Sequence, residues 1–293
     1  MKYLVLFFLA LGYCLDDNDL VVTRAYVDYL KRHVSWDVEN YENNVFRGWT
    51  IGEIKQFLGL IDLNTAVKGA PDVKLMKSIP SAVNWAGSQC DHDVKSQGSC
   101  GACWAFVAAN MLSDRCCMEQ SDKGWLSIQE LISCDNASFG CYGGSLSAPV
   151  RYMQAHKGLV PEKCYSYIAR KEDCPTKCEN GDDWTKAHVC NCNKIENCRN
   201  TLGIKNCLVT GPVPIGFSVC QSFMSYRKGI YKCDCESYIG NHATLVVGYS
   251  DKPECHYHVK NSWGTGWGMN GYYDMACESC RIAGGPICVD ITD

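Results

Sequence analysis

One segment of this sequence carries residue types suited to nucleophilic chemistry. It reads Gln97-Gly-Ser-Cys100-Gly-Ala-Cys103-Trp104, and the apolar run 103–116 predicts a long buried helix beginning at Cys103. A cysteine attacks as the thiolate, and a helix N-terminus beside a cation lowers the pKa of a thiol. The sequence therefore predicts that Cys103 is a nucleophile.

The cation that such a thiolate needs would be a histidine. His242 directly precedes the apolar run 243–248, so we expect it at the start of a buried strand, on a rigid scaffold that suits a general base. Asn261 closes the next predicted strand and could orient the imidazole through a hydrogen bond, which Trp263 would shield from water. For a histidine considered alone, a satisfied core or edge position is the more common alternative.

Composition limits the kind of protein that can carry these residues. The chain has 293 residues, of which 46% are hydrophobic and 20% charged, enough for one large domain or two lobes. The 28 Lys and Arg against 32 Asp and Glu give a net charge of −4. Without a basic surplus, we expect no nucleic acid partner.

The cysteine content and the N-terminus indicate an oxidising compartment. Twenty-two cysteines in 293 residues are typical of a disulfide framework. Residues 1–14 are predicted to be a signal peptide, with Lys2, the apolar run 3–11 and a small-residue end at Cys14. The run is too short to cross a membrane, which takes about 20 apolar residues, so we expect no membrane anchor. These features predict the secretory pathway, leading to lysosome-like vesicles or the exterior.

Cysteine parity and position divide the chain further. Removal of Cys14 would leave 21 of the 22 cysteines, an odd number, so one thiol lacks an intramolecular partner. The remaining cysteines lie between Cys90 and Cys288, and none lies between residues 15 and 89. A boundary is therefore expected near residue 79.

Residues 15–79 have the character of a pro-segment. Apolar spacing over 21–34 predicts one helix, and residues 51–58 predict a second. The aromatic residues between them are too few for a separate core and should pack against the rest of the protein; they are Trp36, Tyr41, Phe46 and Trp49. A permanent small domain is the alternative.

The region 80–293 falls into a helical and a β-rich half, which predicts an α+β fold with a cleft between lobes. In the half 80–160, helices are expected over 103–116, after the capping box Ser127-Ile-Gln-Glu130, and over 147–156. In the half 208–293, short β-type runs occupy residues 213–219, 244–249, 257–260, 271–275 and 287–290.

Residues 164–207 form an insert between these halves. Seven cysteines with little periodicity predict a loop-rich segment held by disulfides. The pairs Cys190-x-Cys192 and Cys174-x-x-x-Cys178 could be zinc ligands instead, but thiols are normally oxidised in a secreted chain. We expect no metal and no cofactor.

The sequence resembles the papain family of cysteine proteases, and within it the cathepsin B group. The motif Cys100-Gly-Ala-Cys103-Trp104 with His242 and Asn261 downstream carries this resemblance. Further matching motifs span nearly the whole chain: Ser113-Asp-Arg115, Cys141-Tyr-Gly-Gly144, residues 157–160, residues 211–213 and residues 267–271. The resemblance implies a papain-like two-lobe fold, with the active site in the cleft and a short helical pro-segment running backwards through it as an inhibitor.

The resemblance also implies roles for individual residues. Cys103 would be the nucleophile, His242 the base and acid, and Asn261 the residue that orients the imidazole. The side chain of Gln97 and the backbone N–H of Cys103 would form the oxyanion hole, although a glutamine before a glycine turn is usually an ordinary loop residue. We therefore expect a cysteine endopeptidase made as a zymogen, acting on proteins and peptides through a thioester.

Substrate contacts are expected at five positions, Trp263 among them. Gly143 and Gly144 would let a substrate backbone approach closely, although an ordinary turn is the alternative. Gly216 would line the second specificity pocket and favour bulky apolar groups. Cys280 aligns with the acidic residue that lets cathepsin B accept Arg in this pocket. Basic side chains of the substrate should therefore bind less favourably in the second pocket of this protein.

The resemblance further implies the disulfides Cys100–Cys141, Cys90–Cys117 and Cys134–Cys174. Asn136 heads the Asn136-Ala-Ser138 glycosylation sequon. In place of the occluding loop with its adjacent histidine pair, the chain continues with Pro161-Glu-Lys-Cys164, and no His-His pair occurs in it. We expect an open primed side and endopeptidase activity.

A second class of function remains open, namely a catalytically inactive, disulfide-rich secreted binding protein with a papain fold. Such a scaffold would need none of Gln97, Cys103, His242 and Asn261, and all four are present. We expect a monomer in either case.

Overall fold

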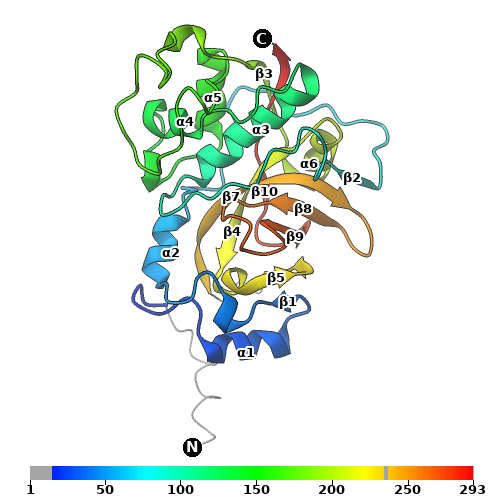
Figure 1. Ribbon diagram of the computed structural model, residues 1–293. Coiled ribbons are helices and arrows are strands. Elements are labelled where there is room, and N and C mark those ends of the chain that lie inside the picture. The colour runs from blue at the N-terminus through cyan, green and yellow to red at the C-terminus, as the bar shows by residue number, and fades with distance from the viewer. Residues whose placement is uncertain (1–14, 234–236, 293) are drawn as a thin grey trace, which may run out of the picture.

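A computed structural model describes residues 15–233 and 237–292, so the predicted signal peptide, residues 1–14, lies outside the described residues. Figure 1 shows two lobes, with a group of helices above a twisted sheet. The N-terminal segment wraps along the side and the base of the sheet lobe through α1 and α2. The predicted α+β fold is confirmed.

The upper lobe is built around α3 (Cys103–Glu119), whose residues from Cys103 to Cys116 are buried. It is accompanied by α4 (Ile128–Cys134) and α5 (Ser147–His156), which confirms the three predicted helices. Ser127 caps α4 by accepting a hydrogen bond from the backbone N–H of Glu130. Because α3 is enclosed on all sides, its N-terminus has a fixed position.

The lower lobe is a mainly antiparallel sheet in the order β10-β4-β7-β8-β9-β6, with β2 paired to β7. The strands are β2 (Ala82–Asn84), β4 (Val213–Cys220), β6 (Ile230–Tyr231), β7 (Tyr238–Ser250), β8 (His256–Lys260), β9 (Tyr272–Ala276) and β10 (Ala283–Gly284). Strand β7 begins earlier than predicted because Asn241 and His242 continue the ladder with β4. His242 therefore lies inside a strand and not at its start.

The prediction that the last β run belongs to the sheet lobe is wrong. Strand β11 (Pro286–Thr292) pairs with β3 (Asn191–Asn197) and packs on α3 in the helical lobe. Conversely, β2 comes from the N-terminal half and joins the sheet lobe. Each lobe thus contains a strand from the opposite end of the peptidase region.

The insert 164–207 is held by disulfides, as predicted, but it is more regular than expected. It contains β3 and most of α6 (Asn200–Leu208), because β3 finds its partner β11 far along the sequence. The zinc alternative is wrong for the described cysteines, since the four candidates lie in separate disulfides: Cys134–Cys174, Cys164–Cys178, Cys116–Cys190 and Cys192–Cys288.

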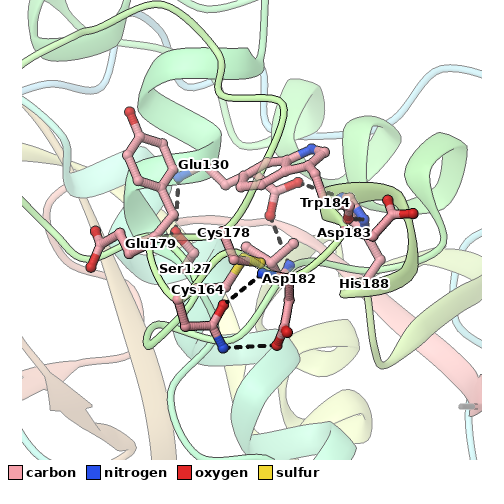
Figure 2. The surroundings of a disulfide bond; sticks show 12 residues. Ser127, Glu130, Cys164, Cys178, Glu179, Asp182, Asp183, Trp184 and His188 are labelled. Atoms are coloured by element: carbon pink, nitrogen blue, oxygen red, sulfur yellow. Dashed lines mark hydrogen bonds and ion pairs between the residues drawn. A yellow bond between two sulfur atoms is a disulfide. The ribbon is translucent and has the colours of Figure 1, made fainter.

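A buried carboxylate connects this insert to the helices. Figure 2 shows Glu130 of α4 beside Trp184 and His188 of the insert, next to the disulfide Cys164–Cys178. One oxygen of Glu130 accepts hydrogen bonds from Tyr152 Oη at 2.9 Å and His188 Nε2 at 2.8 Å. Because Glu130 is fully buried, these bonds hold the insert against the helical lobe.

The N-terminal segment packs against the rest of the protein, as predicted, and its strand pairs with the sheet lobe. Its elements are α1 (Arg24–His33), β1 (Asp37–Val38) and α2 (Ile51–Phe57), and β1 pairs with β5 (Tyr226–Lys228). The Trp36 ring lies 5.2 Å from Tyr231, and the Phe46 ring lies 5.2 Å edge-on to Trp263. Short 3-10 turns complete the described elements: Tyr41–Asn43, Gly140–Tyr142, Trp184–Lys186 and Gln221–Ser225.

Candidate active site

Cys103 is the only free cysteine among those that the structure describes. It is buried and begins α3, after a turn fixed by the disulfide Cys100–Cys141. The backbone N–H of Gly101 donates to the carbonyl of Cys141 at 3.0 Å and secures the same turn. The free thiol therefore lies at a helix N-terminus, where the predicted odd cysteine was expected.

An imidazole with one available nitrogen faces this helix end. His242 is fully buried in β7, and its Nε2 lies 2.8 Å from Oδ1 of Asn261. That oxygen also accepts the backbone N–H of Ser262 at 2.8 Å, which fixes the orientation of the amide. Nε2 consequently carries the proton, and Nδ1, which has no hydrogen-bond partner, is left as an acceptor.

Two further contacts define the surroundings of this imidazole. The Trp263 ring stacks on it at a centroid distance of 4.7 Å, in the shielding position predicted from the sequence. The backbone N–H of Ala243, the residue after His242, interacts with the Cys103 thiol. Strand β7 therefore meets the N-terminus of α3 at the thiol.

Gln97 is fully buried and directs an amide donor into the same place. Its Nε2 donates to the Phe57 carbonyl at 2.9 Å and to the Cys100 carbonyl at 2.8 Å. Ser262 Oγ donates to Gln97 Oε1 at 2.7 Å and so fixes the amide. A peptide carbonyl from the N-terminal segment thus accepts a hydrogen bond from the side chain that was predicted to donate to the oxyanion.

Ser262 was missed by the sequence reasoning. Its hydroxyl orients Gln97, and its backbone N–H orients Asn261. The sequence signal that could have identified Ser262 was its position between Asn261 and Trp263, two residues already assigned to the site.

The N-terminal segment follows the cleft beside the two predicted glycines. Gly144 donates its backbone N–H to the Gly59 carbonyl at 2.9 Å, and Ile61 donates to the Gly144 carbonyl at 3.1 Å. Gly143 has a φ of 115°, and a Cβ there would lie 2.8 Å from the Gly59 carbonyl oxygen. A side chain at Gly143 would therefore obstruct this backbone pairing, whereas one at Gly144 would clash with the Trp104 ring.

Gly216 lies beside the next residue of that segment, and Cys280 bonds to the same strand as Gly216. Leu60 is buried, and a Cβ on Gly216 would lie 2.6 Å from its Cδ2 atom. The Cys280 carbonyl accepts the N–H of Ser218 at 2.7 Å, and its sulfur is bonded to Cys233. The position that aligned with an acidic residue therefore carries an uncharged disulfide.

The ionisation of the thiol and the imidazole differs from the sequence expectation. Burial raises the pKa of the Cys103 thiol to about 11, although the N–H groups of Ala243 and Gly59 act in the opposite direction. Burial lowers the pKa of His242 to about 4, against the effect of its bond to Asn261. The N-terminal segment covers the site, so both groups are held neutral.

The remaining predicted positions are placed as follows. The disulfides Cys90–Cys117 and Cys134–Cys174 are present. Asn136 is exposed just after α4, while the Ser138 hydroxyl is buried and donates to Asp135 at 2.8 Å. Within the described residues, no group of His, Cys, Asp and Glu could hold a metal, and no helix has the length and apolar character to cross a membrane.

A two-lobe α+β fold with this thiol, imidazole and amide at the cleft defines the class of papain-like cysteine peptidases. The chain belongs to the papain family of cysteine proteases, because residues 79–289 match the sequence profile of that family.

Individual relatives agree with this assignment. Procathepsin L of Rattus norvegicus is 31% identical over 245 residues, which cover 80% of this chain and 72% of that protein. Cysteine protease Amb a 11.0101 of Ambrosia artemisiifolia is 32% identical over 205 residues, 67% of this chain and 50% of that protein, so the match spans about half of its length. The structure of procathepsin B S9 from Trypanosoma congolense has the same fold, with a TM-score of 0.76 at 22% identity, over 91% of this chain and 99% of that one.

Proposed function

We propose that the protein is the zymogen of a cysteine endopeptidase. One observation carries the proposal: the Gln97 amide holds a peptide carbonyl, that of Phe57, while the N–H groups of Gly59 and of Ala243, the residue after His242, interact with the free thiol of Cys103. A site that binds a peptide carbonyl next to a nucleophile and a base is suited to acyl transfer.

The reaction follows from these groups once the N-terminal segment has left. The Cys103 proton moves to His242 Nδ1, and the thiolate attacks the carbonyl carbon of the substrate. The oxyanion receives hydrogen bonds from Gln97 Nε2 and the backbone N–H of Cys103. The intermediate collapses to a thioester while His242 protonates the leaving amine.

Deacylation repeats these steps with water. His242 removes a proton from the water, which attacks the thioester carbonyl and forms a second oxyanion in the same hole. The carboxylic acid is released, and the proton returns to the Cys103 sulfur. Asn261 keeps Nδ1 directed at the thiol throughout.

The N-terminal segment, residues 15–79, acts in this proposal as the inhibitor. Leu60 forms a parallel bridge with Gly144, and we propose that a substrate runs in the opposite, antiparallel direction. The reversed chain fills the oxyanion hole and the apolar pocket without presenting a bond for attack. We place the boundary of this segment near residue 79 as part of the same proposal. The proposal also includes passage through the secretory pathway to vesicles or the exterior, which the dense disulfide framework supports.

The enzyme is further proposed to be cathepsin B-like, with an open primed side. The chain lacks a His-His pair, which in the related enzymes captures the substrate C-terminus. An internally cleavable peptide with both ends blocked should therefore be hydrolysed. Release of dipeptides from a free C-terminus, without cleavage of the blocked peptide, would contradict the open primed side and the endopeptidase activity.

We also propose that the second specificity pocket prefers bulky apolar side chains. Leu60 occupies the space beside Gly216, and the disulfide Cys233–Cys280 places no negative charge there. Profiling with a peptide library tests this proposal, and dominance of Arg at that position would oppose it.

Alkylation of the matured protein tests the central proposal. At mildly acidic pH an ordinary thiol is almost fully protonated, so rapid labelling requires a strongly lowered pKa. We expect selective labelling of Cys103, located by mass spectrometry, with parallel loss of peptide hydrolysis. No labelling and no hydrolysis in a fully processed sample would instead favour the inactive binding protein.

A further inference from the structure

A short stretch of the N-terminal segment binds far from the thiol. Residues 67–73, here called the strap, follow the cleft segment, residues 57–61, and lie against β3. Figure 1 shows this part of the chain in light blue, passing from α2 towards β3. Of the connecting residues, Asp62 and Asn64 are exposed, whereas Thr65 is buried and donates to the Gly284 carbonyl at 2.6 Å. The linker is thus fixed at Thr65, and the strap begins two residues later with the buried Val67.

Asn197, the last residue of β3, is fully buried and makes five hydrogen bonds to the strap. Its Oδ1 accepts the backbone N–H of Val67 at 2.8 Å, and its Nδ2 donates to the carbonyls of Val67 at 3.1 Å and Ala70 at 3.0 Å. Its backbone N–H donates to the Pro71 carbonyl at 2.8 Å, and its carbonyl accepts the N–H of Val73 at 3.0 Å. Every polar atom of Asn197 thus bonds to the strap.

Within the described residues, the side-chain amide of Asn197 bonds only to the strap. The strap thus supplies every hydrogen-bond partner of this buried amide, and water would have to replace these bonds once the strap has left. The strap also adds one parallel β-bridge to the end of β3, between Asp72 and Asn197. The strap is the partner that the site fits.

Charged groups lie at the two ends of the strap. Arg199 pairs with Asp72 at 2.8 Å, and Arg151 Nη2 donates to the Lys68 carbonyl at 2.9 Å. A hollow lined by Arg151, Gln154 and residues 193–196 lies beside the strap, while Val67 itself is buried in the hydrophobic core. Polar bonds centred on Asn197 hold the strap.

The cleft segment uses different partners. Phe57 bonds to Gln97, Gly59 pairs with Gly144, and Leu60 lies against Gly216. None of these three peptidase residues contacts the strap through a hydrogen bond in the described structure. The two attachments therefore use different hydrogen-bond partners, and they are joined by Leu63 and Thr65, which also lie beside Gly216.

We propose that the site around Asn197 is a docking site in its own right, which keeps the strap bound after the cleft segment has been displaced. The zymogen then opens in two steps: the cleft segment leaves first and exposes Cys103, and the strap leaves second. The binding of the strap to Asn197 does not depend on the proposed function. Only the consequence, the stepwise opening of the zymogen, rests on the proposed inhibitory role of the N-terminal segment.

Hydrogen exchange of the full chain, followed by mass spectrometry, tests the separation. All variants carry Cys103→Ala, so that self-cleavage does not occur. Leu60→Glu places a carboxylate against Gly216 and should release the cleft segment. We expect the Ile61 amide to exchange at least about tenfold faster, while the amides of Val67 and Val73 keep their protection.

Asn197→Ala should have the reciprocal effect. The amides of Val67 and Val73 then exchange at least about tenfold faster, while the Ile61 amide stays protected. Asn193→Ala is the matched control, because Asn193 lies on the same strand but bonds to Asp290 and not to the strap.

Two outcomes would overturn the proposal. Loss of protection in both segments with Leu60→Glu would show a single cooperative unit, and full protection of the strap in Asn197→Ala would show that Asn197 does not hold it. If Asn197→Ala fails to fold, Val73→Pro removes one strap donor while leaving the peptidase region unchanged. Hydrogen exchange does not depend on peptide hydrolysis. The experiment would therefore still test the strap proposal if the peptidase proposal failed.

Discussion

The ring of His242 and the amide of Asn261 are joined by one hydrogen bond of 2.8 Å, and this bond decides which nitrogen of the imidazole can accept a proton. Oδ1 of Asn261 accepts, so Nε2 must donate, and Nδ1 is left unprotonated and without a partner. The side chain of an asparagine thereby sets the tautomer of the proposed base.

Asn261→Ala should consequently weaken catalysis without removing the nucleophile. We expect kcat/KM for a peptide substrate to fall by about 10- to 100-fold, since general acid–base catalysis contributes about 10²–10⁴-fold in all. The loss should be mainly in kcat. Unchanged kcat/KM across the pH range would contradict the orienting role.

Gln97→Ala should remove a donor to the oxyanion. Loss of one such donor typically lowers kcat by about 10²–10³-fold, with a smaller change in KM. Steady-state kinetics of the matured enzyme provide the measurement. Gln154→Ala is the control, because this exposed glutamine bonds to the Asn193 carbonyl on the outer surface; equal losses in both variants would point to a general structural effect.

The closed zymogen should lose stability in acid through His242. Burial lowers the pKa of His242 to about 4 in this state, whereas an unfolded histidine has a pKa of about 6.5, so the unfolded chain binds more protons between these values. The stability contributed by the neutral imidazole is present above pH 6.5 and lost as the pH falls to about 4, by up to about 3 kcal/mol.

Urea unfolding of the full chain at several pH values measures this effect. His242→Gln should flatten the dependence between pH 6.5 and 4, because glutamine does not titrate. A slope that stays the same in this variant would assign the acid sensitivity to other groups.

The pair His188–Glu130 should contribute more stability in acid, in contrast to His242. Burial alone would lower the pKa of His188, but the hydrogen bond and the charge of Glu130 outweigh it, and the pKa is raised. A raised pKa contributes stability that is present below the pKa of unfolded histidine and lost as the pH rises through the folded value. The insert should therefore be held more firmly in acid.

Limited proteolysis of the insert at pH 5 and pH 8 tests this expectation. Cleavage should be faster at pH 8 in the wild type, and His188→Gln should remove most of the difference once the protease's own pH dependence is subtracted. His256→Gln serves as the control, since His256 is only half-buried and its ring contacts the Glu254 carbonyl. Identical profiles for wild type and His188→Gln would refute the role of the pair.

The disulfide Cys100–Cys141 should support both stability and reactivity. Replacing both cysteines by alanine should lower the free energy of unfolding by about 2–5 kcal/mol. It should also slow alkylation of Cys103 in the matured enzyme, because the turn before α3 loses its fixed position. Denaturant unfolding and labelling rates measure the two effects, and a stable variant with normal labelling would show that the turn is held by other contacts.

The parts of the site that depend on local signals could be predicted from the sequence. Cys103 begins a helix with strong apolar character, and Asn261 directly follows a short strand. The elements that carry these two residues, and their common place in the site, could therefore be predicted. The aromatic residues before α2 were expected to pack against the body, and Phe46 contacts Trp263. Periodicity and motif spacing were sufficient for these features.

Features that depend on distant pairing could not be predicted in this way. Strand β3 has no clear alternation of its own and becomes a strand by pairing with β11, about ninety positions later. Burial reverses the expected direction of the pKa shift of Cys103, and part of its surroundings, including Gly59, comes from a distant part of the chain; the Gly59 N–H itself lowers the pKa. Asn197 carries no motif at all, and only the bound strap reveals its importance.

The exchange of strands between the lobes also affects how the enzyme would behave after accidental proteolysis. Thr210 is exposed in the connection between α6 and β4. A cut there would produce two fragments, of which the first keeps β2 in the sheet lobe and the second keeps β11 beside α3. Each fragment thus contributes a strand to the lobe formed mainly by the other fragment. The two chains of a nicked enzyme would therefore remain associated, with the cleft intact.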